Sequence, residues 1–189
     1  MKIGVLALQG AFAEHIAMLR RLGVEAVEVR KAAQLADLDG LIIPGGESTT
    51  IGKLAVDFNL MEPLIDFGET RPVWGTCAGA IFLSKDARRE QPLLGLMDIT
   101  VERNAFGRQV ESFEADLEVP ALEGPPFHAV FIRAPLIEKV GADARVVSQL
   151  ADGRIVAAQQ GHLLATSFHP ELTNDSRFHE YFLKLIEQR

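Results

Sequence analysis

The chain has 189 residues, enough for one domain with a full hydrophobic core or at most two small domains. Hydrophobic residues make up 48% and charged residues 24%, as in ordinary soluble globular proteins, and no apolar run is long enough to span a bilayer. The net charge of -7 argues against a nucleic-acid-binding protein, because such proteins need a basic surface to neutralise phosphates.

Cys77 is the only cysteine, so the chain cannot form an intrachain disulfide, and a lone thiol fits a reducing compartment. The sequence starts directly with an apolar, strand-like run and has no arrangement typical of a secretory signal peptide. We therefore expect a cytoplasmic protein. In such a protein Cys77 is either a small buried side chain or a reactive nucleophile.

The first half of the sequence alternates short apolar runs with segments of helical periodicity. Residues 3–8 are almost all apolar, which favours a buried strand, and Ile16 and Leu19 then share one face of a helix that ends at Gly23. Ser48 is the expected N-cap of the next helix, which runs towards residue 58. Further strands are expected at 24–29, 40–44 and 72–76, and further helices at 61–67 and 78–84. This alternation predicts an α/β fold with a flavodoxin-like open sheet, parallel in this half, and helices on both faces.

The second half carries many short apolar runs joined by turns, which predicts additional strands. Asp152 and Gly153 form a hairpin signal between two of these runs, and a helix is expected at 176–188. No linker or repeat separates the halves, so we expect one domain over residues 1–189. The pattern leaves open whether the added strands extend the main sheet or form another. They are expected at 99–102, 111–119, 129–134, 146–150, 155–159 and 163–168.

Cys77 lies between two glycines where a strand is expected to meet a helix. The spacing from Gly75 to Cys77 to Gly79 is typical of a nucleophile elbow, a tight turn that presents a reactive side chain above a sheet. A helix starting after Cys77 directs its N-terminal amides towards the sulfur, and the amide of Ala78 is placed to donate to an oxyanion. The alternative is a small buried cysteine at a tight turn, which these residues alone do not exclude.

His169 is the best candidate for the base that a cysteine nucleophile needs. It follows an expected strand and precedes Pro170, which biases it towards an extended conformation. In an extended chain the side chains of His169 and Glu171 point to the same side, so the carboxylate can orient the imidazole. The alternative is a histidine in a turn, with Glu171 capping the following segment.

The remaining histidines lack such a setting, and no group of residues has the ligand spacing of a metal site. His15 is expected on an exposed helix face and His179 on the C-terminal helix, while His128 and His162 begin strands. We interpret all four as structural or solvated.

A glycine pair follows the third expected strand. Gly45 and Gly46 allow a turn that directs the Gly46 amide into the cleft at the carboxyl ends of the strands, as a second oxyanion donor; a plain turn is the alternative. Three motifs now occur in order, at 44–48, 75–79 and 167–171, and together they resemble the triad (class I) glutamine amidotransferases. Finer agreement with the glutaminase subunits of pyridoxal 5′-phosphate synthases lies at 8–10, 14–15, 102–109, 112–114 and 131–135.

This resemblance implies a glutaminase that hydrolyses L-glutamine to glutamate and ammonia through a cysteine thioester, with Cys77, His169 and Glu171 as its triad. The ammonia would pass to a (β/α)8-barrel synthase subunit that builds pyridoxal 5′-phosphate. Since pyridoxal 5′-phosphate is then the product, it should not be a cofactor of this chain, and no other cofactor is expected. The resemblance also implies that Gln9 couples docking of this partner to the oxyanion hole. The residues that it places around glutamine are Gly46, Glu47, Ser48, Arg103, Ile132 and Arg133.

Three other functions compete with this one. The nearest is the glutaminase subunit of another amidotransferase complex, against which the segment 102–109 argues. Another is a cysteine hydrolase or chaperone-like protein of related flavodoxin-like architecture, which does not usually carry His-Pro-Glu near its C-terminus. The last is a non-catalytic binding module, but folding does not require Cys77, His169 and Glu171 together.

Overall fold

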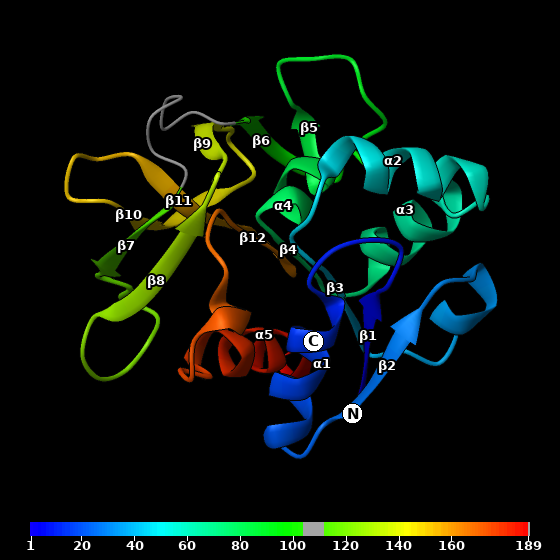
Figure 1. The fold of residues 1–189 in the computed structure, drawn as a ribbon, viewed down its shortest axis with the longest axis horizontal. Helices are drawn as coiled ribbons and strands as arrows, with labels where there is room; N and C mark the ends of the chain where they lie inside the picture. The colour runs from blue at the N-terminus through cyan, green and yellow to red at the C-terminus, as the bar shows by residue number, and fades with distance from the viewer. Residues whose placement is uncertain (104–111, 189) are drawn as a thin grey trace.

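The computed structural model describes residues 1–103 and 112–188 and has an α/β fold built around a large mixed sheet (Figure 1). Neighbouring parallel strands form the first part of this sheet, in the spatial order β2-β1-β3-β4-β12. This part has the expected parallel topology. The bounds are β1 Lys2–Leu6, β2 Glu25–Val29, β3 Gly40–Ile43, β4 Val73–Thr76 and β12 Leu163–Thr166.

The strands of the second half both extend this sheet and form another, which answers the question left open by the sequence. Beyond β12 the sheet continues in the order β11-β9-β6-β5, and β10 also pairs with β11. A separate two-stranded antiparallel sheet contains β7 and β8. The expected turn joins β10 to β11, with Gly153 at a φ of 85°. The bounds are β5 Ser84–Asp86, β6 Met97–Glu102, β7 Ser112–Leu117, β8 Phe127–Ile132, β9 Leu136–Val140, β10 Arg145–Gln149 and β11 Ile155–Gln160.

Helices cover both faces of the parallel strands (Figure 1). Ile42 of β3 packs with residues of α1 and α5, whereas its neighbours Leu41 and Ile43 pack with residues of α2, α3 and α4. All three side chains are fully buried, so this strand is a continuous apolar run rather than an alternating one. The helices are α1 Phe12–Arg21, α2 Ser48–Asp57, α3 Met61–Thr70, α4 Ala78–Leu83 and α5 Arg177–Glu187, with the 3₁₀ helices η1 Ala32–Leu35 and η2 Pro170–Leu172.

Several local predictions differ from the structure. Ser48 does not cap α2: Glu47 occupies the N-cap position, and Ser48 Oγ donates to Gln91 Oε1 at 3.3 Å. Strands β1 and β12 end earlier than expected, because the chain leaves the sheet after Leu6 and Thr166 to form loops at its edge. The expected strand 129–134 is shifted to β8, β5 and β9 were not expected, and residue 111 lies outside the described residues. Among the described helices, none combines the length and apolarity needed to cross a bilayer.

Candidate active site

Cys77 lies at a sharp turn between β4 and α4, as the glycine spacing predicts. Its φ of 48° and ψ of -108° form a conformation that residues with a side chain rarely adopt. A Cβ on Gly75 would lie 2.4 Å from the carbonyl oxygen of Gly79, and a Cβ on Gly79 would lie 1.9 Å from the carbonyl oxygen of Ile43. Only glycine fits at these two positions. The close backbone packing around the elbow therefore supports the strained conformation of Cys77.

Cys77 lines a cavity of about 410 Å³ at the carboxyl ends of the parallel strands, where open α/β sheets bind ligands. Ala78 and His169 also line this cavity. Gln9 and Glu171 are not part of its wall and lie behind Gly46 and His169, respectively. The structure thus gathers the predicted site residues from several loops and from the ends of helices and strands that are separate in the sequence. All residues predicted to surround glutamine line the cavity: Gly46, Glu47, Ser48, Arg103, Ile132 and Arg133.

His169 and Glu171 form a buried pair beside Cys77. His169 Nδ1 lies 2.7 Å from Glu171 Oε1, with the two side chains 10% and 0% exposed. The pairing was expected from an extended chain, but Glu171 instead reaches the imidazole through the 3₁₀ turn of η2. A Cβ on Gly45 would lie 2.5 Å from His169 Cε1 and 3.3 Å from Cys77 Cβ, so both residues crowd the same glycine. With Nδ1 engaged by the carboxylate, Nε2 is the nitrogen left for the thiol.

The surroundings of His169 favour its protonated form. Burial acts to lower the pKa, yet hydrogen bonds with Cys77 and Glu171, together with the charges of both, raise the pKa of His169 to about 10. At neutral pH the site therefore holds a proton donor beside the sulfur of Cys77. This arrangement suits a reaction in which a nucleophile attacks a carbonyl carbon and the leaving group needs a proton.

The cavity wall carries charges of both signs. Arg103 Nη2 and Glu47 Oε1 are 2.6 Å apart, with side chains 31% and 37% exposed. Burial acts to raise the pKa of Glu47, but hydrogen bonds from Thr49 and the charge of Arg103 lower it overall, so Glu47 remains a carboxylate. The cavity can therefore receive a zwitterionic ligand, whose ammonium and carboxylate groups need one partner each.

Gln9, in the loop after β1, lies against the glycine turn that follows β3. Its Oε1 accepts a hydrogen bond from the backbone N–H of Glu47 at 2.7 Å. A Cβ on Gly46 would lie 2.3 Å from the same oxygen, so the Gln9 side chain packs closely against the peptide that joins Gly46 to Glu47. Ala11 N–H also donates to the carbonyl of Gly45 at 3.0 Å. The loop after β1 thus fixes the backbone orientation of the turn that lines the cavity.

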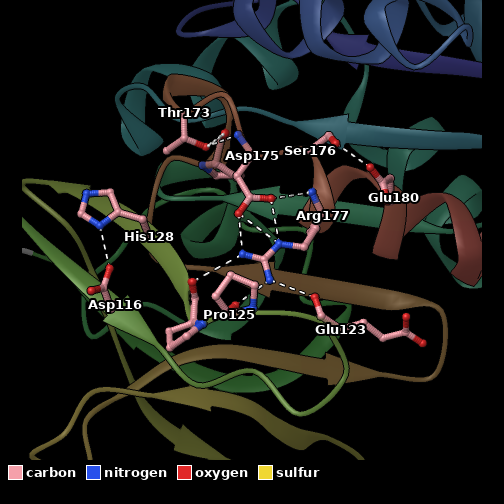
Figure 2. A network of polar contacts seen from close by, with 11 residues as sticks. Asp116, Glu123, Pro125, His128, Thr173, Asp175, Ser176, Arg177 and Glu180 are labelled. Carbon is pink, nitrogen blue, oxygen red and sulfur yellow. Dashed lines mark hydrogen bonds and ion pairs between the residues drawn. The ribbon is translucent and has the colours of Figure 1, made fainter.

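Arg177 anchors the segment that follows the histidine and glutamate pair. Its guanidinium group donates to Asp175, with a shortest distance of 2.6 Å, and to the carbonyls of Glu123 and Pro125 at 3.0 and 2.6 Å (Figure 2). His169 N–H donates in turn to the carbonyl of Val130 in β8 at 2.8 Å. These contacts tie the chain on either side of Glu171 to β8 and to the loop that precedes it.

The chain matches the SNO glutamine amidotransferase family over residues 5–188. The chain belongs to this family. A protein named "Pyridoxal 5′-phosphate synthase subunit PdxT" from Herpetosiphon aurantiacus is 63% identical over 190 residues, covering 98% of this chain and 100% of the relative. A protein of the same name from Dehalococcoides mccartyi is also 63% identical, covering 99% and 98%. A crystal structure of a glutamine amidotransferase, 53% identical, superposes with a TM-score of 0.94 and covers 99% and 100% of the two chains.

These similarities confirm the predicted family and the predicted α/β fold. They do not favour the alternative of a glutaminase subunit from another amidotransferase complex. The relatives at this level of identity all carry the same name, and each matches almost the whole chain. Among the described residues of this SNO-family chain, no group of histidine, cysteine and carboxylate side chains is arranged to hold a metal ion.

Two buried histidines behind the triad candidates were missed by the sequence analysis. His15 was expected on an exposed face, but both His15 and His179 are fully buried, whereas His128 is exposed between two carboxylates. The apolar periodicity could have located them. His15 precedes Met18, Leu19 and Leu22 by three, four and seven positions, which places it on the inner face of α1, and His179 has the same relation to Phe182, Leu183 and Ile186 in α5.

Proposed function

We propose that this chain is the glutaminase subunit of a pyridoxal 5′-phosphate synthase. The observation that carries the proposal is the strained Cys77 beside the buried His169–Glu171 pair, in a chain 63% identical over almost its whole length to subunits of that name. Membership of a glutamine amidotransferase family supports hydrolysis of glutamine in general. The proposed product passed to the partner subunit is ammonia.

In the proposed first step, the sulfur of Cys77 attacks the side-chain amide carbon of glutamine. The amides of Gly46 and Ala78 hold the developing oxyanion. The carbon–nitrogen bond then breaks, and His169 gives its proton to the nitrogen, which leaves as ammonia. Glu171 orients His169 and stabilises its imidazolium form, a role that the 2.7 Å contact and the raised pKa support.

In the second step, water adds to the carbonyl carbon of the glutamyl thioester. His169, now neutral, takes a proton from the water, and the carbon–sulfur bond breaks to release glutamate and the Cys77 sulfur. The same two amides hold the second oxyanion. The sum of the two steps is glutamine plus water giving glutamate plus ammonia, with the enzyme unchanged.

The charged walls of the cavity suit the two ends of an amino acid. Glu47 is placed to pair with the α-ammonium group of glutamine, and the guanidinium groups of Arg103 and Arg133 suit its α-carboxylate. In this proposal glutamine replaces the contact that Arg103 and Glu47 make with each other. Ser48 and Ile132 complete the substrate wall, and the carbonyl oxygen of Ile132 lies 4.0 Å from Cys77 Sγ.

The proposed partner is a (β/α)8-barrel synthase subunit that accepts the ammonia. Hydrolysis without an acceptor would lose ammonia to solvent, so control by the partner has a chemical rationale. Gln9 is suited to transmit docking because it holds the peptide between Gly46 and Glu47. We further propose that the protein acts in the cytoplasm, where a single reactive thiol stays reduced.

The test is glutamate release from glutamine by the purified chain, with and without its barrel synthase. We expect low activity of the isolated chain and stimulation by the synthase, with both activities lost in Cys77→Ala. Equal rates with and without the synthase would contradict the proposed partner control, and thiol-independent hydrolysis would contradict the proposed mechanism.

A further inference from the structure

The second oxygen of the Glu171 carboxylate faces a buried pair of histidines. His15 Nε2 lies 3.4 Å from Glu171 Oε2 and 3.2 Å from Thr76 Oγ1. On the other side of the same ring, His15 Nδ1 lies 2.9 Å from His179 Nε2. The side chains of His15 and Glu171 are 0% exposed. A line of polar contacts therefore runs inward from His169 through Glu171 and His15 to His179.

This line joins elements that are far apart in the sequence. His15 comes from α1, His179 from α5, Thr76 from the end of β4 and Glu171 from η2. Trp74, two residues before Thr76 in β4, packs edge-on against the imidazoles of His15 and His179 at ring-centroid distances of 5.7 and 5.0 Å. The packing fixes the rings where the triad candidates are anchored.

The contacts select one tautomer for each histidine. A bare lone pair on His15 Nε2 would face the carboxylate of Glu171 in a buried site, which is unfavourable, so Nε2 carries the proton. His15 Nδ1 is then an acceptor and receives a hydrogen bond from the Nε2–H of His179. His179 Nδ1 is consequently left as a bare acceptor, and it has no hydrogen-bond partner among the described residues.

Both histidines are neutral in this arrangement. Burial lowers the pKa of His15 well below the ordinary value, and the nearby His179 and His169 act in the same direction. Burial, followed by the charge of Arg21, lowers the pKa of His179 to about 3. A neutral donor can hold a carboxylate without cancelling its charge, so Glu171 keeps its full attraction for the imidazolium of His169.

We propose that His15 is a positioning residue whose Nε2–H, fixed by His179, orients Glu171 towards His169; this inference rests on the triad of the proposed function. Glu171 Oε2 has no conventional hydrogen bond among the described residues, and a buried carboxylate oxygen left without a donor is costly. His15 supplies that donor when the 3.4 Å contact tightens as His169 takes the proton from water in the second step. Until that contact tightens, the Nε2–H of His15 is directed at Thr76 Oγ1.

The experiment uses the full chain in complex with its barrel synthase and compares four variants with wild type. His15→Leu removes the donor, His15→Gln keeps an N–H near the position of Nε2, and His179→Leu removes the group that fixes the His15 tautomer. Leu19→Ala, at another fully buried position of α1, controls for lost packing. The measurements are kcat and KM for glutamine, and the rate of Cys77 alkylation by iodoacetamide across pH, on forms whose folding is verified by thermal unfolding.

We expect His15→Leu to lower kcat roughly 10-fold to 100-fold, by analogy with the loss seen when the hydrogen-bond partner that orients a metal-ligating side chain is removed. KM should stay unchanged because His15 does not line the cavity. The rise in the rate of Cys77 alkylation with pH should move to higher pH. A loosened Glu171 stabilises the imidazolium of His169 less well, and a weaker imidazolium favours the thiolate of Cys77 less. His15→Gln should restore part of kcat, and His179→Leu should show a smaller loss in the same direction.

Each failure has a distinct meaning. A wild-type complex that does not hydrolyse glutamine contradicts the proposed function itself. An active wild type with unchanged kcat and unchanged alkylation profile in His15→Leu overturns only the role of His15. Equal losses in His15→Leu and Leu19→Ala also overturn it, because packing alone would then explain the effect. If His15→Leu does not fold, an unchanged profile in folded His179→Leu overturns the inference.

Discussion

Replacing Glu171 by glutamine isolates the contribution of one negative charge, because the side chain keeps its size. The contact from Glu171 Oε1 to His169 Nδ1 is 2.7 Å, between side chains that are 0% and 10% exposed. A hydrogen bond to a charged group contributes about 1.5–3 kcal/mol to stability. If this contribution is realised in the transition state, kcat should fall roughly 10-fold to 150-fold. KM for glutamine should change little, since Glu171 is not part of the cavity wall.

The assay is glutamate release by the synthase complex at saturating glutamine. Glu69→Gln is the matched control, because Glu69 is exposed near the end of α3 and does not line the cavity. The hydrogen bond that His169 donates to Glu171 is one of the interactions that raise the pKa of His169, so an NMR titration of Glu171→Gln should find His169 losing its proton at lower pH. A kcat equal to that of wild type, with an unchanged titration of His169, would refute the assigned role of Glu171.

Three further predictions concern the elbow, the substrate and the dependence on pH. Gly79→Ala should lower stability by about 1–3 kcal/mol in thermal unfolding, because its Cβ would lie 1.9 Å from the Ile43 carbonyl oxygen; an unchanged Tm would show that the elbow is not tightly packed. Arg103→Ala should raise KM for glutamine more than it lowers kcat, and an unchanged KM would remove Arg103 from the substrate site. The raised pKa of His169 should make the free energy of unfolding of wild type larger than that of His169→Gln. This difference should be complete below pH 6.5 and should fall to zero towards about pH 10. Urea unfolding of both proteins across this range measures it, and a difference that does not change with pH would contradict the prediction.

The elbow and the parallel sheet were predictable because both depend on local sequence. The glycines at 75 and 79 are required by backbone contacts within and next to the turn, and the residue between them must point out of it. The buried strands of the first half are continuous apolar runs, as parallel strands covered on both faces should be. In contrast, β9 contains Glu138 and Lys139 and β5 is very short, so neither has an apolar pattern that single-sequence reasoning could find.

The arrangement behind the triad could be predicted only in part. Helical periodicity places His15 on the inner face of α1, but its partner His179 is 164 residues away and only the tertiary structure brings the two together. A buried polar side chain needs such a partner, and without knowledge of the partner an exposed position was the more favourable assignment. The pairing of Glu171 with His169 was predicted, but from an extended chain. In the structure a 3₁₀ turn brings the carboxylate to the imidazole.

The proposed mechanism requires Cys77 to form a covalent glutamyl thioester. The direct measurement is the intact mass of the chain after mixing with glutamine and the synthase and quenching in acid, followed by peptide mapping. We predict an added glutamyl group on the peptide that contains Cys77, absent from Cys77→Ala, which should also form no glutamate. Continued glutamate formation by Cys77→Ala, or by wild type without any adduct on Cys77, would contradict the proposed mechanism.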